Sequence, residues 1–203
     1  NLEHGIALGH RRLSIQDLSS SGHQPMESSS GRYVIVYNGE IYNFLKIQKE
    51  LISLGHEFFG HSDTEVLLAA VEQWGIADAL KSLTGMFALA LWDKKNRMLS
   101  IARDRVGEKP LYYGWQGKSF VFASELTALR FHPDWQNKIN RDALALYMRH
   151  NYITAPYTIY QDIRKLTPGT ILHIPYSTRP GELPVSEPYW RMKNVAESGN
   201  NST

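Results

Sequence analysis

The sequence lacks cysteine altogether, and neither sign of charge dominates it. Without Cys among the 203 residues, a disulfide framework and a thiolate zinc site are excluded, and no thiol nucleophile lies within these residues. The 22 basic and 20 acidic residues give a net charge of +2, which offers no reason to expect nucleic acid or a membrane as partner. Long apolar runs and a signal-peptide pattern are also missing, so we expect a cytoplasmic protein.

Motifs for metals and nucleotides are missing as well. The histidines are scattered without metal-ligand spacing. There is no glycine-rich phosphate loop and no Ser-Gly-Gly-x-Asp run of the kind that binds ATP. We therefore expect this chain to bind neither a metal nor a cofactor.

Hydrophobic patterning divides the chain into expected strands and helices. Strands are expected at 5–15, 33–37, 86–92, 98–103, 111–115, 119–123 and 170–174, and helices at 44–52, 62–74, 77–83, 125–131 and 141–150. Tight polar turns join successive strands, which favours antiparallel sheets, and helices are grouped between the strands. The pattern predicts an α+β fold with two antiparallel sheets face to face and helices outside.

The last 29 residues differ in character from the rest of the chain. Four prolines are spaced through them, at Pro175, Pro180, Pro184 and Pro188, and the chain finishes in small polar residues. Spaced prolines are typical of an extended linker. We expect one domain at residues 1–174, followed by a proline-rich linker at residues 175–203.

Asn38 and Gly39 follow the apolar strand expected at 33–37. As an isolated dipeptide, Asn-Gly favours positive φ and a hairpin turn. Alternatively, the Asn38 side-chain amide and the Gly39 backbone N–H could form an oxyanion hole, which stabilises the negative oxygen of a tetrahedral intermediate. The neighbouring residues Glu40 to Asn43 favour the second interpretation.

Three further side chains complete a candidate receptor for an amino acid. Arg12 lies toward the end of the first expected strand, where it could bind an α-carboxylate through two parallel hydrogen bonds or simply be exposed. Asp63 stands at a helix start, where it could be an N-cap or could turn inward to hold an α-ammonium group. Glu40 could share that second role.

Arg103 and Asp104 end another expected strand, just before Gly107 and Pro110. They could pair with each other and order a charged turn beside the pocket without touching substrate. We therefore assign them a structural role near the site.

Six ordered sequence blocks resemble the class II glutamine amidotransferase domain of glutamine-hydrolysing asparagine synthetases. They are Gly-His-Arg-Arg-Leu-Ser-Ile (9–15), Asn-Gly-Glu-Ile-Tyr-Asn (38–43), Ser-Asp-Thr-Glu-Val (62–66), Gly-Met-Phe-Ala-Leu-Ala-Leu-Trp-Asp (85–93), Arg-Asp-Arg-Val-Gly-Glu-Lys-Pro-Leu-Tyr-Tyr (103–113) and Ala-Ser-Glu (123–125). The resemblance implies the four-layer αββα sandwich of N-terminal-nucleophile hydrolases. It also implies that glutamine is bound and hydrolysed, and that ammonia is released for amidation of aspartate.

The resemblance implies a role for each candidate residue. Asn38 and Gly39 would form the oxyanion hole, while Glu40 and Asp63 would hold the α-amino group of glutamine. Arg12 would bind the α-carboxylate, with the backbone of the next four residues nearby, namely Leu13, Ser14, Ile15 and Gln16.

The resemblance also implies that the chain is truncated at both ends. The family's nucleophile is an N-terminal Cys whose own α-amine acts as base. This Cys and the first strand of the fold would precede residue 1, and a synthetase domain that uses ATP and Mg would follow residue 203. The 203 residues alone should then be inactive. The resemblance also allows a homodimer.

Two other interpretations remain open. The chain could belong to an amidotransferase of the same fold that serves a different ammonia acceptor. It could also be a glutamine-binding or scaffold module without catalysis, which the absence of Cys favours.

Overall fold

The computed structural model describes residues 5–11 and 22–200, and two antiparallel sheets form its centre. The larger sheet has the order β1-β2-β3-β4-β8-β9, and the smaller one β6-β5-β7. The strands are β1 (Met26–Glu27), β2 (Tyr33–Ile41), β3 (Gly85–Asp93), β4 (Met98–Arg103), β5 (Tyr112–Gln116), β6 (Ser119–Ala123), β7 (Ile163–Lys165), β8 (Thr170–Pro175) and β9 (Glu187–Pro188). The expected α+β class with antiparallel sheets is therefore confirmed.

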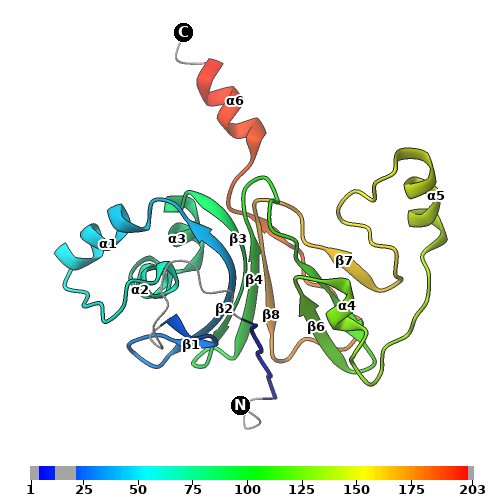
Figure 1. Ribbon diagram of the computed structural model, residues 1–203, viewed down its shortest axis with the longest axis horizontal. Helices are drawn as coiled ribbons and strands as arrows, with labels where there is room; N and C mark the ends of the chain where they lie inside the picture. The colour runs from blue at the N-terminus through cyan, green and yellow to red at the C-terminus, as the bar shows by residue number, and fades with distance from the viewer. Residues whose placement is uncertain (1–4, 12–21, 201–203) are drawn as a thin grey trace.

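Three helices cover one face of the larger sheet (Figure 1). They are α1 (Phe44–Ser53), α2 (Asp63–Trp74) and α3 (Ile76–Ser82). Their apolar residues, such as Leu51, Leu67 and Leu80, are fully buried against Ile35 and Phe87 of the sheet. Strand alternation explains this layer, because every second residue of β2 and β3 points toward the helices.

The smaller sheet packs on the opposite face of the larger one (Figure 1). Val36 and Ala90, which are paired across β2 and β3, lie in a second core with Leu111, Tyr113 and Leu166. Beyond the smaller sheet lie α4 (Leu126–Leu129), which contacts β6, and α5 (Arg141–His150), in which only Ala143 is buried. The outermost helical layer is therefore sparse on this side.

Strand β2 is longer than the strand expected at 33–37 and excludes the turn, which was the alternative interpretation of Asn38 and Gly39. These residues do not form a turn, because β2 continues to Ile41 and pairs with β3 along its whole length. Gly39 lies opposite Phe87, and its φ is not positive. The ladder with a long neighbouring strand therefore overrides the local turn preference of Asn-Gly.

Other differences concern elements at the edges of the sheets. Residues 5–11, within the first expected strand, have no strand structure, and residues 12–15 lie outside the described part. Short strands β1, β7 and β9 were not expected, and α4 is shorter than the helix expected at 125–131. Such short elements depend on pairing partners far along the chain rather than on local pattern.

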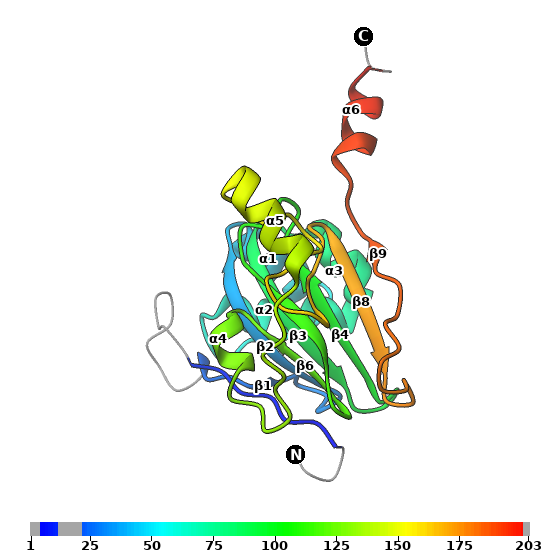
Figure 2. The ribbon, with the colours of Figure 1, turned by 90° about the vertical axis from the view of Figure 1, so that its right-hand side faces the viewer.

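The proline-rich tail is partly built into the domain. Strand β9 pairs with β8, and Tyr189 is only 8% exposed. Beyond it, α6 (Met192–Asn200) projects away from the sheets (Figure 2). The chain from residue 175 thus includes a short strand paired at the sheet edge and a helix. Within the described residues, none of the helices combines the length and apolar character needed to cross a membrane.

Candidate functional site

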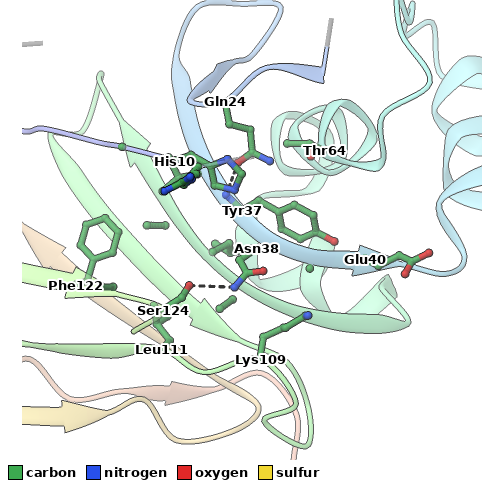
Figure 3. A pocket seen from close by; sticks show the side chains of 18 of the residues that line it. His10, Gln24, Tyr37, Asn38, Glu40, Thr64, Lys109, Leu111, Phe122 and Ser124 are labelled. Atoms are coloured by element: carbon green, nitrogen blue, oxygen red, sulfur yellow. Dashed lines mark hydrogen bonds between the residues drawn. The ribbon is translucent and has the colours of Figure 1, made fainter. Parts of the chain in front are cut away.

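A cavity of about 660 Å³ opens between the two sheets beside β2 (Figure 3). Four of the residues singled out from the sequence line it: Asn38, Gly39, Glu40 and Asp63. Other lining residues come from the loop before β5, from the end of β6 and from the segments flanking residues 12–21, including His10, Arg11, Gln24, Lys109, Leu111, Phe122 and Ser124. The fold therefore brings residues from several separate parts of the chain to one hollow.

The Gly39 backbone N–H points to the edge of β2 that faces away from β3. On that edge, the Tyr37 N–H donates to Oε1 of Gln24 at 2.6 Å and the Ile41 N–H donates to Oδ2 of Asp63 at 3.0 Å. Gly39 lies between them with the same parity, so its N–H points the same way. No group within residues 5–11 and 22–200 accepts from it. A single unpaired donor is thus presented where β2 meets the cavity.

A glycine is required at position 39 because β3 approaches so closely. A Cβ built there would lie 2.2 Å from the Met86 carbonyl oxygen and 2.7 Å from Cα of Phe87. These are backbone atoms of the neighbouring strand, which cannot move without disturbing the sheet. The reason for glycine is therefore steric, and not a left-handed conformation.

The Asn38 side chain crosses the gap between the two sheets. Its Nδ2 donates to Oγ of Ser124, just after β6, at 3.1 Å (Figure 3). A primary amide has two N–H groups, so one donor remains. The Ser124 hydroxyl fixes the rotation of the amide. The remaining amide N–H of Asn38 and the backbone N–H of Gly39 belong to consecutive residues.

Asp63 is buried at the first turn of α2 and faces β2. The helix is capped by Ser62, whose Oγ accepts from the Thr64 N–H at 3.2 Å, so Asp63 is not needed as the cap. Its Oδ2 instead accepts from the Tyr37 hydroxyl at 3.0 Å as well as from Ile41. Both bonds use one carboxylate oxygen.

Burial shapes the protonation of this pair. Burial raises the pKa of Asp63, although hydrogen bonds from Ile41 and Tyr37 oppose that effect. Burial and the adjacent carboxylate raise the pKa of Tyr37, so its hydroxyl remains a donor. A positively charged ligand group would favour the ionised form of Asp63, because opposite charges lower a carboxyl pKa.

Arg103 and Asp104 hold the loop that precedes β5, and each bonds to backbone rather than to the other's side chain. Asp104 is fully buried and accepts five backbone N–H groups, from Phe87, Val106, Gly107, Glu108 and Lys109. Arg103 donates to three carbonyls, of Gly107, Lys109 and Leu166, at 2.6 to 2.9 Å. Burial lowers the pKa of Arg103. The expected mutual ion pair is therefore wrong, since no such contact joins these two described side chains.

The remaining predicted residues lie outside the described part of the chain. Arg12, Leu13, Ser14, Ile15 and Gln16 all fall in the gap between residues 11 and 22. Their assignment to the α-carboxylate stays a prediction. Among residues 5–11 and 22–200, no group of His, Asp and Glu is arranged to hold a metal ion.

Sequence reasoning missed Gln24, Lys109 and Ser124. Ser124 lies in the Ala-Ser-Glu block, and Lys109 lies in the block that starts at Arg103. The sequence pattern assigned neither of them a role in the site. Gln24 sits in a polar loop that carries no pattern. Nothing local shows that these three side chains line one cavity with β2, because they come from separate parts of the chain, and the Ser124–Asn38 contact spans 86 residues.

Comparisons with known proteins identify the family. Residues 1–190 match the model of a glutamine amidotransferase domain. The chain is 40% identical over 173 residues to asparagine synthetase [glutamine-hydrolyzing] 3 of Bacillus subtilis, covering 84% of this chain and 28% of that protein. It is 38% identical over an alignment of 218 positions to a putative asparagine synthetase 2 of Methanocaldococcus jannaschii, covering 97% and 42%.

Two further similarities are to a solved structure with a similar fold and to a relative that is named as an amidase. Glutamine phosphoribosylpyrophosphate amidotransferase of B. subtilis superimposes with a TM-score of 0.62 at 23% identity, over 89% of this chain and 34% of that one. The amidase chry2 of Gibberella zeae is 33% identical and is covered over 27% of its length, against 94% of this chain.

The chain thus spans between about a quarter and two-fifths of the length of these curated relatives. The match to the family model extends over nearly the whole chain, and the solved amidotransferase has a similar fold over 89% of it. The chain belongs to the class II glutamine amidotransferase domain family and is related to the N-terminal domain of asparagine synthetases.

Proposed function

We propose that this chain is the glutaminase domain of a glutamine-hydrolysing asparagine synthetase. The observation that carries the proposal is the Gly39 N–H, which has no acceptor among the described residues and which follows Asn38 in a cavity that buried Asp63 also lines. Two donors from consecutive residues suit a carbonyl oxygen that becomes negative, and a buried acid suits an ammonium group. Two relatives named as asparagine synthetases support the larger assignment.

Glutamine would lie along β2 with its carboxamide at one end and its α-amino group at the other. The carboxamide oxygen would accept from Gly39 and Asn38. The α-ammonium would contact Asp63 and Glu40, which both line the cavity. Arg12 and the backbone of residues 13–16 would bind the α-carboxylate, with Arg103 and Asp104 fixing the loop beside the site.

Hydrolysis needs a nucleophile that the 203 residues do not contain as a thiol. The proposal assigns it to a Cys of the encoded polypeptide outside these residues, together with the first strand of an αββα sandwich. Its thiolate would attack the carboxamide carbon, release ammonia and leave a thioester, which water would cleave to glutamate. Metal and cofactor play no part in this domain, whereas ATP and Mg would serve a synthetase domain that amidates aspartate.

Calorimetry tests the binding half of the proposal. The chain should bind L-glutamine in a one-to-one complex and should bind D-glutamine far more weakly, because the acid and the two donors fix the stereochemistry. Ammonia release by the 203-residue chain should be undetectable. An absence of L-glutamine binding would overturn the proposal.

A second candidate is an amidotransferase of the same family with another ammonia acceptor, which the similarity to an amidase favours. The full encoded polypeptide should be assayed with aspartate, ATP and glutamine. Asparagine formation supports the first proposal. Glutaminase activity without asparagine supports the second, and glutamine binding without any hydrolysis supports a non-catalytic binding module.

A further inference from the structure

Lys109 places a positive charge at the cavity that the proposed glutamine site does not use. Its side chain rises from the loop before β5 toward β2 and lies on the side of Asn38 and Glu40 (Figure 3). Within residues 5–11 and 22–200, no acid or other acceptor contacts its Nζ. An ammonium group in a cavity without a protein partner is suited to an anionic ligand atom.

The position of Lys109 is fixed by its backbone. Its N–H donates to Oδ2 of Asp104 at 2.9 Å, and its carbonyl accepts from Nε of Arg103 at 2.7 Å. The same Asp104 oxygen accepts from the Phe87 N–H at 3.2 Å, and Phe87 pairs with Gly39 across β2 and β3. One carboxylate oxygen therefore ties the backbone that carries Lys109 to the strand that flanks the Gly39 donor.

Charges of both signs line the cavity. Asp63 and Glu40 suit the ammonium end of an amino acid, and Arg11 lines the cavity from the segment next to the predicted carboxylate-binding residues. Lys109 enters from the smaller sheet's side, next to Asn38, where the side-chain carbonyl of the ligand would lie (Figure 3). Glutamine is neutral at that end, but glutamate carries a carboxylate there.

We propose that Lys109 is a specificity-determining residue whose Nζ binds the γ-carboxylate of glutamate, the product of the proposed hydrolysis. This inference rests on the proposed function and adds to it a reason for product retention. The cavity discriminates between an amide and a carboxylate through one ammonium group. The ligand that Lys109 favours is thus a five-carbon amino acid with an anionic side chain.

Calorimetry on the 203-residue chain with L-glutamine and L-glutamate tests the inference. The wild-type chain should bind glutamate more tightly than glutamine. In Lys109→Met and in Lys109→Gln, the ratio of the two dissociation constants should shift by about tenfold against glutamate, with glutamine affinity little changed. Lys109→Arg should keep most of the preference. Lys118→Met, in the exposed turn between β5 and β6, is the matched control and should leave the ratio unchanged.

Each outcome has one meaning. A lost glutamate preference in both uncharged variants, with thermal midpoints near wild type, supports the inference. An unchanged ratio overturns it while leaving the proposed function intact. Equal weakening of both amino acids also overturns it, since Lys109 would then bind the part common to the two ligands. Failure of the wild-type chain to bind either amino acid overturns the proposed function and this inference together.

Discussion

Gly39 is the residue at which the packing of the sheet and the presentation of a donor coincide. The close approach of β3 excludes a side chain, and the edge position leaves the backbone N–H pointing into the cavity. Flanking donors are capped by Gln24 and Asp63, so the sheet edge is satisfied on either side of it. One backbone group is thereby left for a ligand without a general loss of hydrogen bonding.

Replacement of Gly39 by Ala tests the steric argument. The added Cβ would meet backbone of β3 at 2.2 Å, so we expect a loss of about 3 kcal/mol or more in the free energy of unfolding. Gly9→Ala is the matched control, since nothing lies within 4 Å of a Cβ there. Urea denaturation measures both. Equal stability of Gly39→Ala and wild type would contradict the steric requirement for glycine at this position.

Asp63→Asn separates the charge of this residue from its hydrogen bonds. Both donors to Asp63 use Oδ2, so an amide oxygen can accept them without a change of shape. We expect glutamine affinity to fall by about tenfold or more, because the α-ammonium loses its anion. Calorimetry reports the affinity, and undiminished binding would contradict the assignment of Asp63 to the amino group.

The stability of the same variant has a defined pH dependence. The pKa of Asp63 is raised by burial, so the folded state favours the protonated acid. Its unfavourable contribution is absent below the unfolded pKa and grows as the pH rises through the folded pKa. Asp63→Asn should therefore match wild type at acid pH and be at least as stable at neutral pH, measured by urea denaturation at both.

Among the structural elements, the loop of residues 104–109 is ordered by one carboxylate. Asp104 is completely buried, and all five donors to it are backbone groups. A buried ion with a full set of hydrogen bonds avoids the large cost of an unpaired charge. The loop is consequently held against β3 at the side of the cavity.

Asp104→Asn should destabilise the protein strongly. The new amide group would face backbone donors that need an acceptor, and we expect a loss of about 3 kcal/mol or more. Asp78→Asn is the control, because its ion pair with Lys81 is exposed and should contribute less than about 1 kcal/mol. Thermal and urea denaturation compare the two, and a small effect at Asp104 would mean that the loop is held by other contacts.

The hairpin of β3 and β4 carries a third buried acid, Asp93, whose pKa shift is opposite in direction to that of Asp63. Burial by itself raises the pKa of Asp93, but hydrogen bonds from Arg32 and from the Asn96 N–H outweigh it and lower the pKa below 3.8. Arg32 donates to both oxygens, at 3.1 and 2.7 Å. The ion pair thus joins the start of β2 to the hairpin turn.

Because the folded pKa of Asp93 is lowered, its stabilising contribution is present above the unfolded pKa of about 3.8 and is lost as the pH falls through the folded value. Asp93→Asn should therefore be less stable than wild type at neutral pH, by about 1 to 2 kcal/mol, and the difference should shrink in strong acid. Urea denaturation across this range measures it. Parallel pH curves for the two proteins would contradict the prediction.

At the scale of the whole molecule, the C-terminal segment has two parts. The part up to residue 191 contacts the sheets, and the helix α6 beyond it is exposed. The Tyr189 hydroxyl donates to the Arg103 carbonyl at 2.9 Å, and its ring lies 6.5 Å from that of Phe87. In contrast, the described side chains of α6 are all exposed. A chain ended after Arg191 should keep its thermal midpoint, whereas one ended after Glu187 should lose about 3 kcal/mol. Equal midpoints for the two truncations would contradict this division.

The sequence alone determined the fold class, the main strands and helices, and four of the residues around the cavity. Hydrophobic period and turn residues are local properties, and they were sufficient for β3, β4, β6 and α2. The six blocks identified the family because the motifs and their order are properties of the sequence itself.

Only the tertiary structure decided how those residues are used. It placed Asn38 and Gly39 in a paired strand, which excludes the alternative of a turn, and it gave Arg103 and Asp104 backbone partners instead of each other's side chains. It also brought Lys109 and Ser124 to the cavity. Strand pairing and burial join positions far apart in the chain, so the free energy that fixes these contacts has no signature in any local stretch of sequence.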